Sequence, residues 1–246
     1  MTDTQYINGP NGKIAYNLHR GNSPLPPIIF LCGFKSDMNG SKAEWLHNYC
    51  VTHNRTYLRF DYFGHGQSDG DFRDFTIGHG LMDSIEMIDE MIDRPAIIIG
   101  SSMGGWIALR LLQLMPHKIH GFIGIAAAPD FTRKIYASLD DGHLAQLEEK
   151  NYIEEESGYD EPYIFTRALF DDGENHCVLG SKIGFDGAVH LIQGKLDTSV
   201  DWHVPESIDA CFAQAIKISL VDDGDHSLSR PQDLETLKTA IEEMFA

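Results

Sequence analysis

Short apolar runs alternate with longer amphipathic stretches along most of this 246-residue chain. The short runs are rich in β-branched side chains and are bounded by Gly, Pro or polar residues, which is typical of buried strands. We expect strands at residues 5–7, 13–18, 27–31, 56–60, 96–99, 121–126, 188–194 and 215–221. Apolar residues at helical spacing predict helices at residues 41–52 and 76–92, from the turn at 100–105 to residue 115, near 205–212, and at 231–245.

The order of these elements predicts the fold class. The first two strands flank a Gly/Pro/Asn turn and read as an antiparallel hairpin, while the later strands alternate with helices. This order predicts an α/β fold with a mostly parallel, twisted sheet of about eight strands and helices on both faces. The alternation breaks at residues 131–187, which we interpret as an insertion into a core made of residues 1–130 and 188–246, within a single domain.

Composition and charge narrow the classes of function. The formal net charge of −18 disfavours binding of nucleic acid and of anionic membrane surfaces. We expect no membrane span, because no apolar run is long enough, and no secretory signal, because the N-terminus is polar. The four cysteines are scattered and suggest reduced thiols, so we expect a cytoplasmic protein. We also expect a monomer or a homodimer.

The turn at residues 100–105, Gly-Ser-Ser-Met-Gly-Gly, lies between a predicted strand and a predicted helix. It contains the pattern G-x-S-x-G with Ser102 at its centre, which is typical of a nucleophile elbow. Such a turn presents the hydroxyl at a helix N-terminus, where free N–H groups and the helix dipole favour negative charge. Ser102 is therefore the candidate nucleophile, and an ordinary tight turn is the alternative.

A serine nucleophile needs a base to take its proton and a carboxylate to orient that base. In a parallel sheet, such groups gather on loops at the carboxyl ends of the strands. Two of these loops contain Asp197, in Gly-Lys-Leu-Asp, and His226, in Gly-Asp-His-Ser. Asp130, at the end of the strand expected at 121–126, remains an alternative acid.

The oxyanion of an acyl-transfer intermediate needs two backbone N–H donors. We expect the N–H of Met103, which follows the nucleophile, and that of Phe34, on the loop after the strand at 27–31. The sequence contains no G-x-G-x-x-G motif, no P-loop and no metal-ligand spacing, so we expect neither a cofactor nor a metal.

Five segments, in order along nearly the whole chain, together resemble the α/β-hydrolase superfamily: residues 31–34, 60–68, 100–105, 194–197 and 225–226. The order Ser102, Asp197, His226 is also the order of nucleophile, acid and base in that fold. More narrowly, residues 34–40, 60–62 and 100–106 resemble the small abhydrolases related to the mitochondrial S-depalmitoylase and acyl-glucuronide esterase. Cys32 departs from the superfamily, which usually has histidine there.

The resemblance implies a compact cap at residues 131–187 and activity on acyl esters and thioesters. Four aromatic residues of this segment could line an acyl-chain pocket or could form the cap's own core: Tyr152, Tyr163, Phe165 and Phe170. Between Leu139 and Glu174 the chain has twelve acidic residues against two basic ones. We expect this charge to disfavour polyanionic substrates such as acyl-CoA, unless the acidic groups form a solvated outer face.

These features predict a serine hydrolase that cleaves carboxylic esters or thioesters of a small or acyl-chain substrate through a Ser-His-Asp triad and an acyl-enzyme. Three alternative functions remain possible on the sequence alone. One is an S-acyl (palmitoyl) protein thioesterase specifically, and another is a lyase or peroxidase that uses the same triad. The third is a catalytically silent binding module of the same fold.

Overall fold

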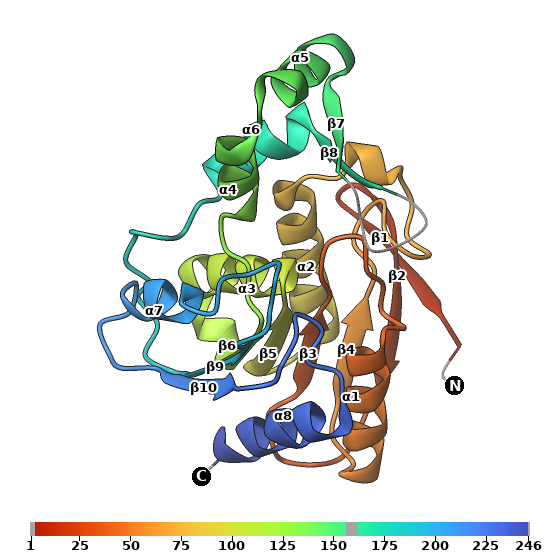
Figure 1. Cartoon of the computed structure of the whole chain (residues 1–246). Coiled ribbons are helices and arrows are strands. Elements are labelled where there is room, and N and C mark those ends of the chain that lie inside the picture. Colours follow the sequence, from red (N-terminus) through yellow and green to blue (C-terminus); the bar gives the residue numbers. More distant parts are fainter. Residues whose placement is uncertain (1–2, 156–161, 246) are drawn as a thin grey trace.

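The computed structural model describes residues 3–155 and 162–245. Within these residues, eight strands form one sheet: β1 (Gln5–Gly9), β2 (Gly12–His19), β3 (Ile28–Leu31), β4 (Tyr57–Phe60), β5 (Ala96–Ser101), β6 (Ile119–Ile125), β9 (Ala188–Gly194) and β10 (Lys217–Val221). Their spatial order is β1-β2-β4-β3-β5-β6-β9-β10 (Figure 1). The β1–β2 and β2–β4 pairs are antiparallel and the others are parallel, which confirms the mostly parallel sheet.

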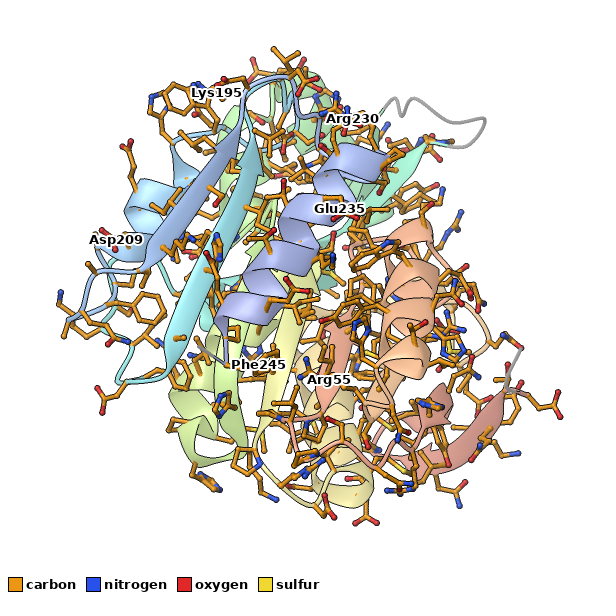
Figure 2. All side chains as sticks on the ribbon, turned by 90° about the horizontal axis from the view of Figure 1, so that it is seen from below. Arg55, Lys195, Asp209, Arg230, Glu235 and Phe245 are labelled. Atoms are coloured by element: carbon orange, nitrogen blue, oxygen red, sulfur yellow. The ribbon has the colours of Figure 1, made fainter. Side chains whose placement is uncertain are left out.

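Helices cover both faces of this sheet. α1 (Ser41–Thr52) and α8 (Pro231–Glu243) lie on one face, in front of the strands in Figure 2. α2 (Ile77–Met91) and α3 (Met103–Leu114) cover the other face, and α7 (Val204–Asp209) links β9 to β10. Two short 3₁₀ turns, η1 (Phe72–Asp74) and η2 (Pro116–Lys118), complete the core.

The apolar pattern that predicted these elements corresponds to burial. Every residue of β3, β4 and β5 is buried, as expected for central strands covered on both faces. Nine of the twelve residues of α3 are buried, in agreement with its nearly continuous apolar sequence. All four cysteines are free thiols, and three of them are buried.

The elements between β6 and β9 lie together at the top of Figure 1, and the chain after them runs back to β9. The described part of residues 131–187 contains α4 (Phe131–Ser138), α5 (Asp141–Lys150), the antiparallel strands β7 (Tyr152–Glu155) and β8 (Tyr163–Thr166), and α6 (Arg167–Asn175). The sequence predicted helical patches here but not the two-stranded sheet. Three acidic residues that contribute to the predicted negative charge, Glu156, Asp160 and Glu161, lie outside the described residues.

Polar contacts attach this inserted segment to the core. Asp172 of α6 accepts a hydrogen bond from the Gly78 N–H, at the start of α2, at 2.7 Å. Trp106 of α3 donates from its indole Nε1 to the His176 carbonyl oxygen at 2.9 Å. Both contacts therefore join the chain at the end of α6 to α2 and α3, the helices on one face of the sheet.

Candidate active site

Ser102 lies in the turn between β5 and α3 with φ 52° and ψ −117°. This left-handed backbone conformation is strained for a residue with a side chain. The neighbouring glycines allow the turn to close: a Cβ on Gly104 would lie 2.1 Å from the Leu31 carbonyl oxygen, and one on Gly100 would lie 2.4 Å from the Gly104 carbonyl oxygen. Steric crowding therefore explains why the motif requires glycine on both sides of the serine.

A continuous line of polar contacts runs from this serine through His226 to Asp197. Ser102 Oγ lies 3.1 Å from His226 Nε2, and His226 Nδ1 lies 2.8 Å from Asp197 Oδ2. Each residue belongs to a different loop at the carboxyl edge of the sheet, after β5, β9 and β10. The Asp197 side chain is fully buried, whereas that of His226 is 33% exposed, so the imidazole is accessible from solvent.

The surroundings of Asp197 favour its ionised form. Burial alone would raise the pKa of Asp197, but hydrogen bonds from His226 and from the Val200 N–H outweigh burial and lower it. Oδ1 accepts from the N–H groups of Ser199 and Val200 at 2.8 and 2.9 Å, and Gln193 donates from Nε2 to Oδ2 at 2.9 Å. The carboxylate is thereby held in an orientation that favours a proton on His226 Nδ1. Sequence reasoning missed Gln193, because a glutamine inside an apolar strand carries no motif.

Asp130, the alternative acid, lies against other groups. Its Oδ1 accepts from the Val178 N–H at 2.8 Å and its Oδ2 accepts from the Leu179 N–H at 3.0 Å. Both carboxylate oxygens therefore bind the chain that follows α6, and they tie the end of the insertion to the end of β6. The structure brings Asp197, and not Asp130, to the imidazole of His226.

The two candidate oxyanion donors border Ser102, the candidate nucleophile. Met103 is the first residue of α3, so its N–H has no acceptor within the helix. A Cβ on Gly33 would lie 3.4 Å from Ser102 Cβ and 3.9 Å from Ser102 Oγ, which places the loop after β3 directly against the nucleophile turn. Phe34 is the next residue of that loop.

The Phe34 side chain is the centre of an aromatic cluster that joins the core to the insertion. Its ring stacks on Phe165 of β8 with a centroid distance of 5.3 Å and an interplanar angle of 8°. It also contacts Phe72 at 4.8 Å, Phe131 at 5.7 Å and Tyr163 at 6.2 Å. The residue that offers a candidate oxyanion donor is therefore packed against the inserted segment.

The four aromatic residues expected at an acyl pocket have different environments. Tyr163 and Phe165 belong to the Phe34 cluster, and Phe170 contacts the Phe165 ring at 6.3 Å. Phe165 and Phe170 are buried, which favours the alternative that they pack the core of the insertion. Tyr152 lies apart from the cluster, beneath the Arg73 guanidinium at 5.3 Å.

The loop after β4 contains two buried titratable groups close to the site. Asp61 accepts from the Met38 N–H at 2.7 Å and from the Gln67 N–H at 2.8 Å, yet burial raises the pKa of its carboxyl to about 6. Burial also lowers the pKa of His65 to about 4, so this imidazole is neutral at physiological pH. His65 is thus a buried structural histidine, in contrast to the solvent-accessible His226.

In residues 3–155 and 162–245, no group of three His, Cys, Asp or Glu side chains could hold a metal ion. In the same part of the chain, no helix combines the length and apolar character needed to cross a membrane.

Comparison with known proteins identifies the family. The model of the alpha/beta hydrolase family matches residues 28–234. The chain belongs to the alpha/beta hydrolase family. This alpha/beta hydrolase is a serine hydrolase, as predicted from the G-x-S-x-G turn.

The relatives agree with that assignment along the whole chain. The palmitoyl-protein thioesterase ABHD10 of Homo sapiens, a mitochondrial protein, is 30% identical over 248 residues, which cover 99% of this chain and 80% of the human protein. The structure of alpha/beta hydrolase domain-containing protein 10 from mouse superposes with a TM-score of 0.90 at 29% identity, covering 99% of this chain and 98% of the mouse chain. A crystal structure from Agrobacterium vitis S4, provisionally described as a hydrolase, has a TM-score of 0.95 and 38% identity over 99% of both chains.

These relatives correct one expectation of the sequence analysis. The cytoplasmic location is wrong, because the ABHD10 proteins of five mammals that match this alpha/beta hydrolase are all named as mitochondrial. The expectation depended on scattered free cysteines, which indicate a reducing environment but do not distinguish one reducing compartment from another.

Proposed function

We propose that this alpha/beta hydrolase cleaves ester or thioester bonds of acyl substrates, with Ser102 as nucleophile, His226 as base and Asp197 as orienting acid. The observation that carries the proposal is the line of contacts from Ser102 Oγ to His226 at 3.1 Å and from His226 to Asp197 at 2.8 Å. The name of the human relative, a palmitoyl-protein thioesterase, supports the narrower reading of an S-acyl protein thioesterase.

The proposed reaction has two halves. His226 Nε2 takes the hydroxyl proton while Ser102 Oγ attacks the acyl carbonyl carbon. The N–H groups of Met103 and Phe34 stabilise the resulting oxyanion. The bond to the leaving alcohol or thiol then breaks, and the imidazolium gives its proton to that group. Water attacks the acyl-enzyme by the same route, and the proposal requires no cofactor.

Covalent labelling with a fluorophosphonate probe tests the nucleophile. We expect the native protein to be labelled and Ser102→Ala to remain unlabelled, whereas Ser101→Ala, which removes the neighbouring hydroxyl, keeps its label. An unlabelled native protein, or a Ser102→Ala variant labelled like the native one, would contradict the proposal and favour a silent binding module.

A panel of acyl substrates tests the reaction and its range. p-Nitrophenyl esters and S-acyl peptides of increasing chain length should be hydrolysed by the native protein, with burst release of p-nitrophenol as the acyl-enzyme accumulates. Preference for long S-acyl peptides would support the thioesterase reading. Failure to hydrolyse any ester or thioester would contradict the proposed function as a whole, and a lyase or peroxidase would then become the better reading.

A further inference from the structure

The loop that carries His226 contains a strained residue. Leu228 has a φ of 44°, a left-handed conformation that is unusual for leucine, and it is 2% exposed. Within the loop, Asp225 Oδ1 accepts a hydrogen bond from the Leu228 N–H at 2.9 Å. Such a conformation persists only where surrounding contacts hold it, so the position of His226 depends on the partners of this loop.

One of these partners comes from the opposite end of the chain. Lys42, on α1, donates from Nζ to the Ser227 carbonyl oxygen at 2.5 Å and to Ser229 Oγ at 3.3 Å. Ser227 directly follows His226, so the lysine binds the Ser227–Leu228 peptide group, one peptide bond beyond the imidazole-bearing residue and directly before the strained Leu228. The contact is available because α1 and α8 lie side by side on the same face of the sheet (Figure 2).

The charged groups around Lys42 belong to the same loop and to α8. Asp225 and Asp233 both favour the ammonium form, and Arg230, labelled in Figure 2, binds Asp233 at 2.9 Å. Arg230 also donates to both carboxylate oxygens of Asp223, at 2.9 and 3.0 Å. Lys42 therefore binds this loop from α1, whereas Arg230, at the start of α8, binds Asp223 and Asp233.

We propose that Lys42 is a positioning residue that holds His226 against Ser102 by binding the Ser227 carbonyl. The inference rests on the proposed function, because it assigns His226 the role of base. Lys42 does not touch the reacting atoms: its ammonium fixes one peptide group, and that peptide group fixes the direction of the imidazole. Loss of this contact leaves a strained loop with fewer constraints, which lowers the fraction of molecules whose imidazole faces the serine hydroxyl.

This role makes activity depend on the protonation of Lys42. Burial lowers the pKa of Lys42 to about 8, and the neighbouring Asp225 and Asp233 offset only part of that effect. Below about pH 8 the ammonium is present and donates strongly, whereas above it the neutral amine is a weaker donor. We therefore expect kcat to fall as the pH rises through about 8.

The lowered pKa of Lys42 also distinguishes a positioning role from a role in stabilising the fold. A lysine whose pKa is lower in the folded protein binds its proton more weakly there than in the unfolded chain, so its charge opposes folding at neutral pH. Replacing it with an uncharged side chain of similar shape should thus leave the melting temperature unchanged or raise it. A lysine with a merely structural role would show the opposite.

Three variants with the full chain test the proposal. Lys42→Met keeps the apolar stem and removes the charge and the donors, whereas Lys42→Arg keeps both. Lys118→Met is the matched control, because it removes a half-buried lysine that pairs with Asp89. The measurements are kcat and KM for a p-nitrophenyl ester, the pH profile of kcat, and the melting temperature.

For Lys42→Met we expect kcat to fall roughly tenfold, as for one lost charge-assisted hydrogen bond, with KM within about twofold and no loss of melting temperature. Lys42→Arg should keep most of the activity and lose the decline near pH 8, because a guanidinium stays charged. Lys118→Met should behave like the native protein.

Three outcomes would overturn the proposal. The first is a native kcat that does not decline between pH 7 and 9.5. The second is a kcat that is unchanged in Lys42→Met. The third is a Lys42→Met variant whose kcat and melting temperature fall in parallel, which would make the lysine structural. The native pH profile tests the proposal even where a variant fails to fold. All three outcomes differ from failure of the proposed function, in which the native protein hydrolyses no ester.

Discussion

Two aspartates at the ends of neighbouring strands show how environment, and not sequence position, distinguishes side chains of the same type. Asp130 follows β6 and Asp197 follows β9, and each follows its strand closely. The oxygens of Asp130 accept two backbone N–H groups from the chain after α6. One oxygen of Asp197 faces His226, so only Asp197 can orient the imidazole.

Conversion of each aspartate to asparagine separates these roles. Asp197→Asn should lower kcat by about 10⁴-fold, because the amide favours the wrong tautomer of the imidazole. Asp130→Asn should leave kcat within a few-fold but lower the free energy of unfolding by about 1–3 kcal/mol, since one buried N–H would face an amide NH₂ group. Steady-state kinetics and urea unfolding provide the readouts. An inactive Asp130→Asn beside an active Asp197→Asn would reverse the assignment of the acid.

At the scale of an element, the loop after β4 links burial of titratable groups to the pH dependence of stability. It buries a carboxyl and an imidazole, and burial shifts both toward their neutral forms. The two groups have opposite effects on stability. As the pH falls from about 6, the folded chain takes up a proton at Asp61 before the unfolded chain does, which stabilises the fold. At His65 the order is reversed: the unfolded chain takes up a proton before the folded chain does, and this destabilises the fold.

Replacement of His65 by phenylalanine isolates one of these effects. The unfolded imidazole has a pKa near 6.5 and the folded one near 4, so the stability that His65 contributes is complete above 6.5 and is lost as the pH falls to 4. Relative to His65→Phe, the native protein should lose up to about 3 kcal/mol of unfolding free energy across that range. Urea titrations at several pH values measure the difference, and a constant difference would contradict the buried, neutral imidazole.

The contact between α6 and α2 offers a further test at this scale. Asp172 of α6 caps the start of α2 through the Gly78 N–H. Asp172→Ala should therefore lower the free energy of unfolding by about 1 kcal/mol and speed hydrogen exchange in α6. Asp171→Ala, which changes an exposed carboxylate one position away, is the matched control and should do neither. Equal exchange in the two variants would mean that this contact does not hold the insertion.

At the scale of the whole molecule, the net charge of −18 should repel anionic substrates. The strength of that repulsion depends on how far the acidic side chains are exposed to solvent. Five acidic residues are exposed at the cap of α5, on α5 and on β7: Asp140, Asp141, Glu148, Glu149 and Glu154. At physiological ionic strength, salt screens the field of such exposed charges beyond about 8 Å. This part of the insertion is therefore a solvated acidic face, which was the alternative in the sequence analysis. Electrostatic repulsion can still act on a substrate that carries several negative charges.

A comparison of two thioesters with the same acyl chain tests this effect. We expect kcat/KM to be lower for the acyl-CoA than for a neutral thioester, and we expect the ratio to approach one as salt is raised from about 10 mM to 1 M. Efficient hydrolysis of a long-chain acyl-CoA at physiological salt would contradict the expectation.

Much of this architecture follows from the sequence, for physical reasons that differ between its parts. The strands and the nucleophile turn were predictable because burial and steric crowding act on adjacent residues, as at Gly100, Ser102 and Gly104. The contact of Lys42 with Ser227 spans 185 positions, and no local pattern records it. The β7–β8 sheet was missed because both strands are only four residues long and partly exposed, and β7 carries two acidic residues.

Phe34 belongs to two parts of the molecule at once. Its backbone adjoins the nucleophile turn, while its ring stacks on Phe165 of the insertion. An exchange of residues 131–187 between relatives would therefore not be a neutral recombination of modules. A chimaera with a foreign insertion would place a different surface against this ring and displace the loop behind it. Successful chimaeras should therefore require residue 34 to be exchanged together with the insertion.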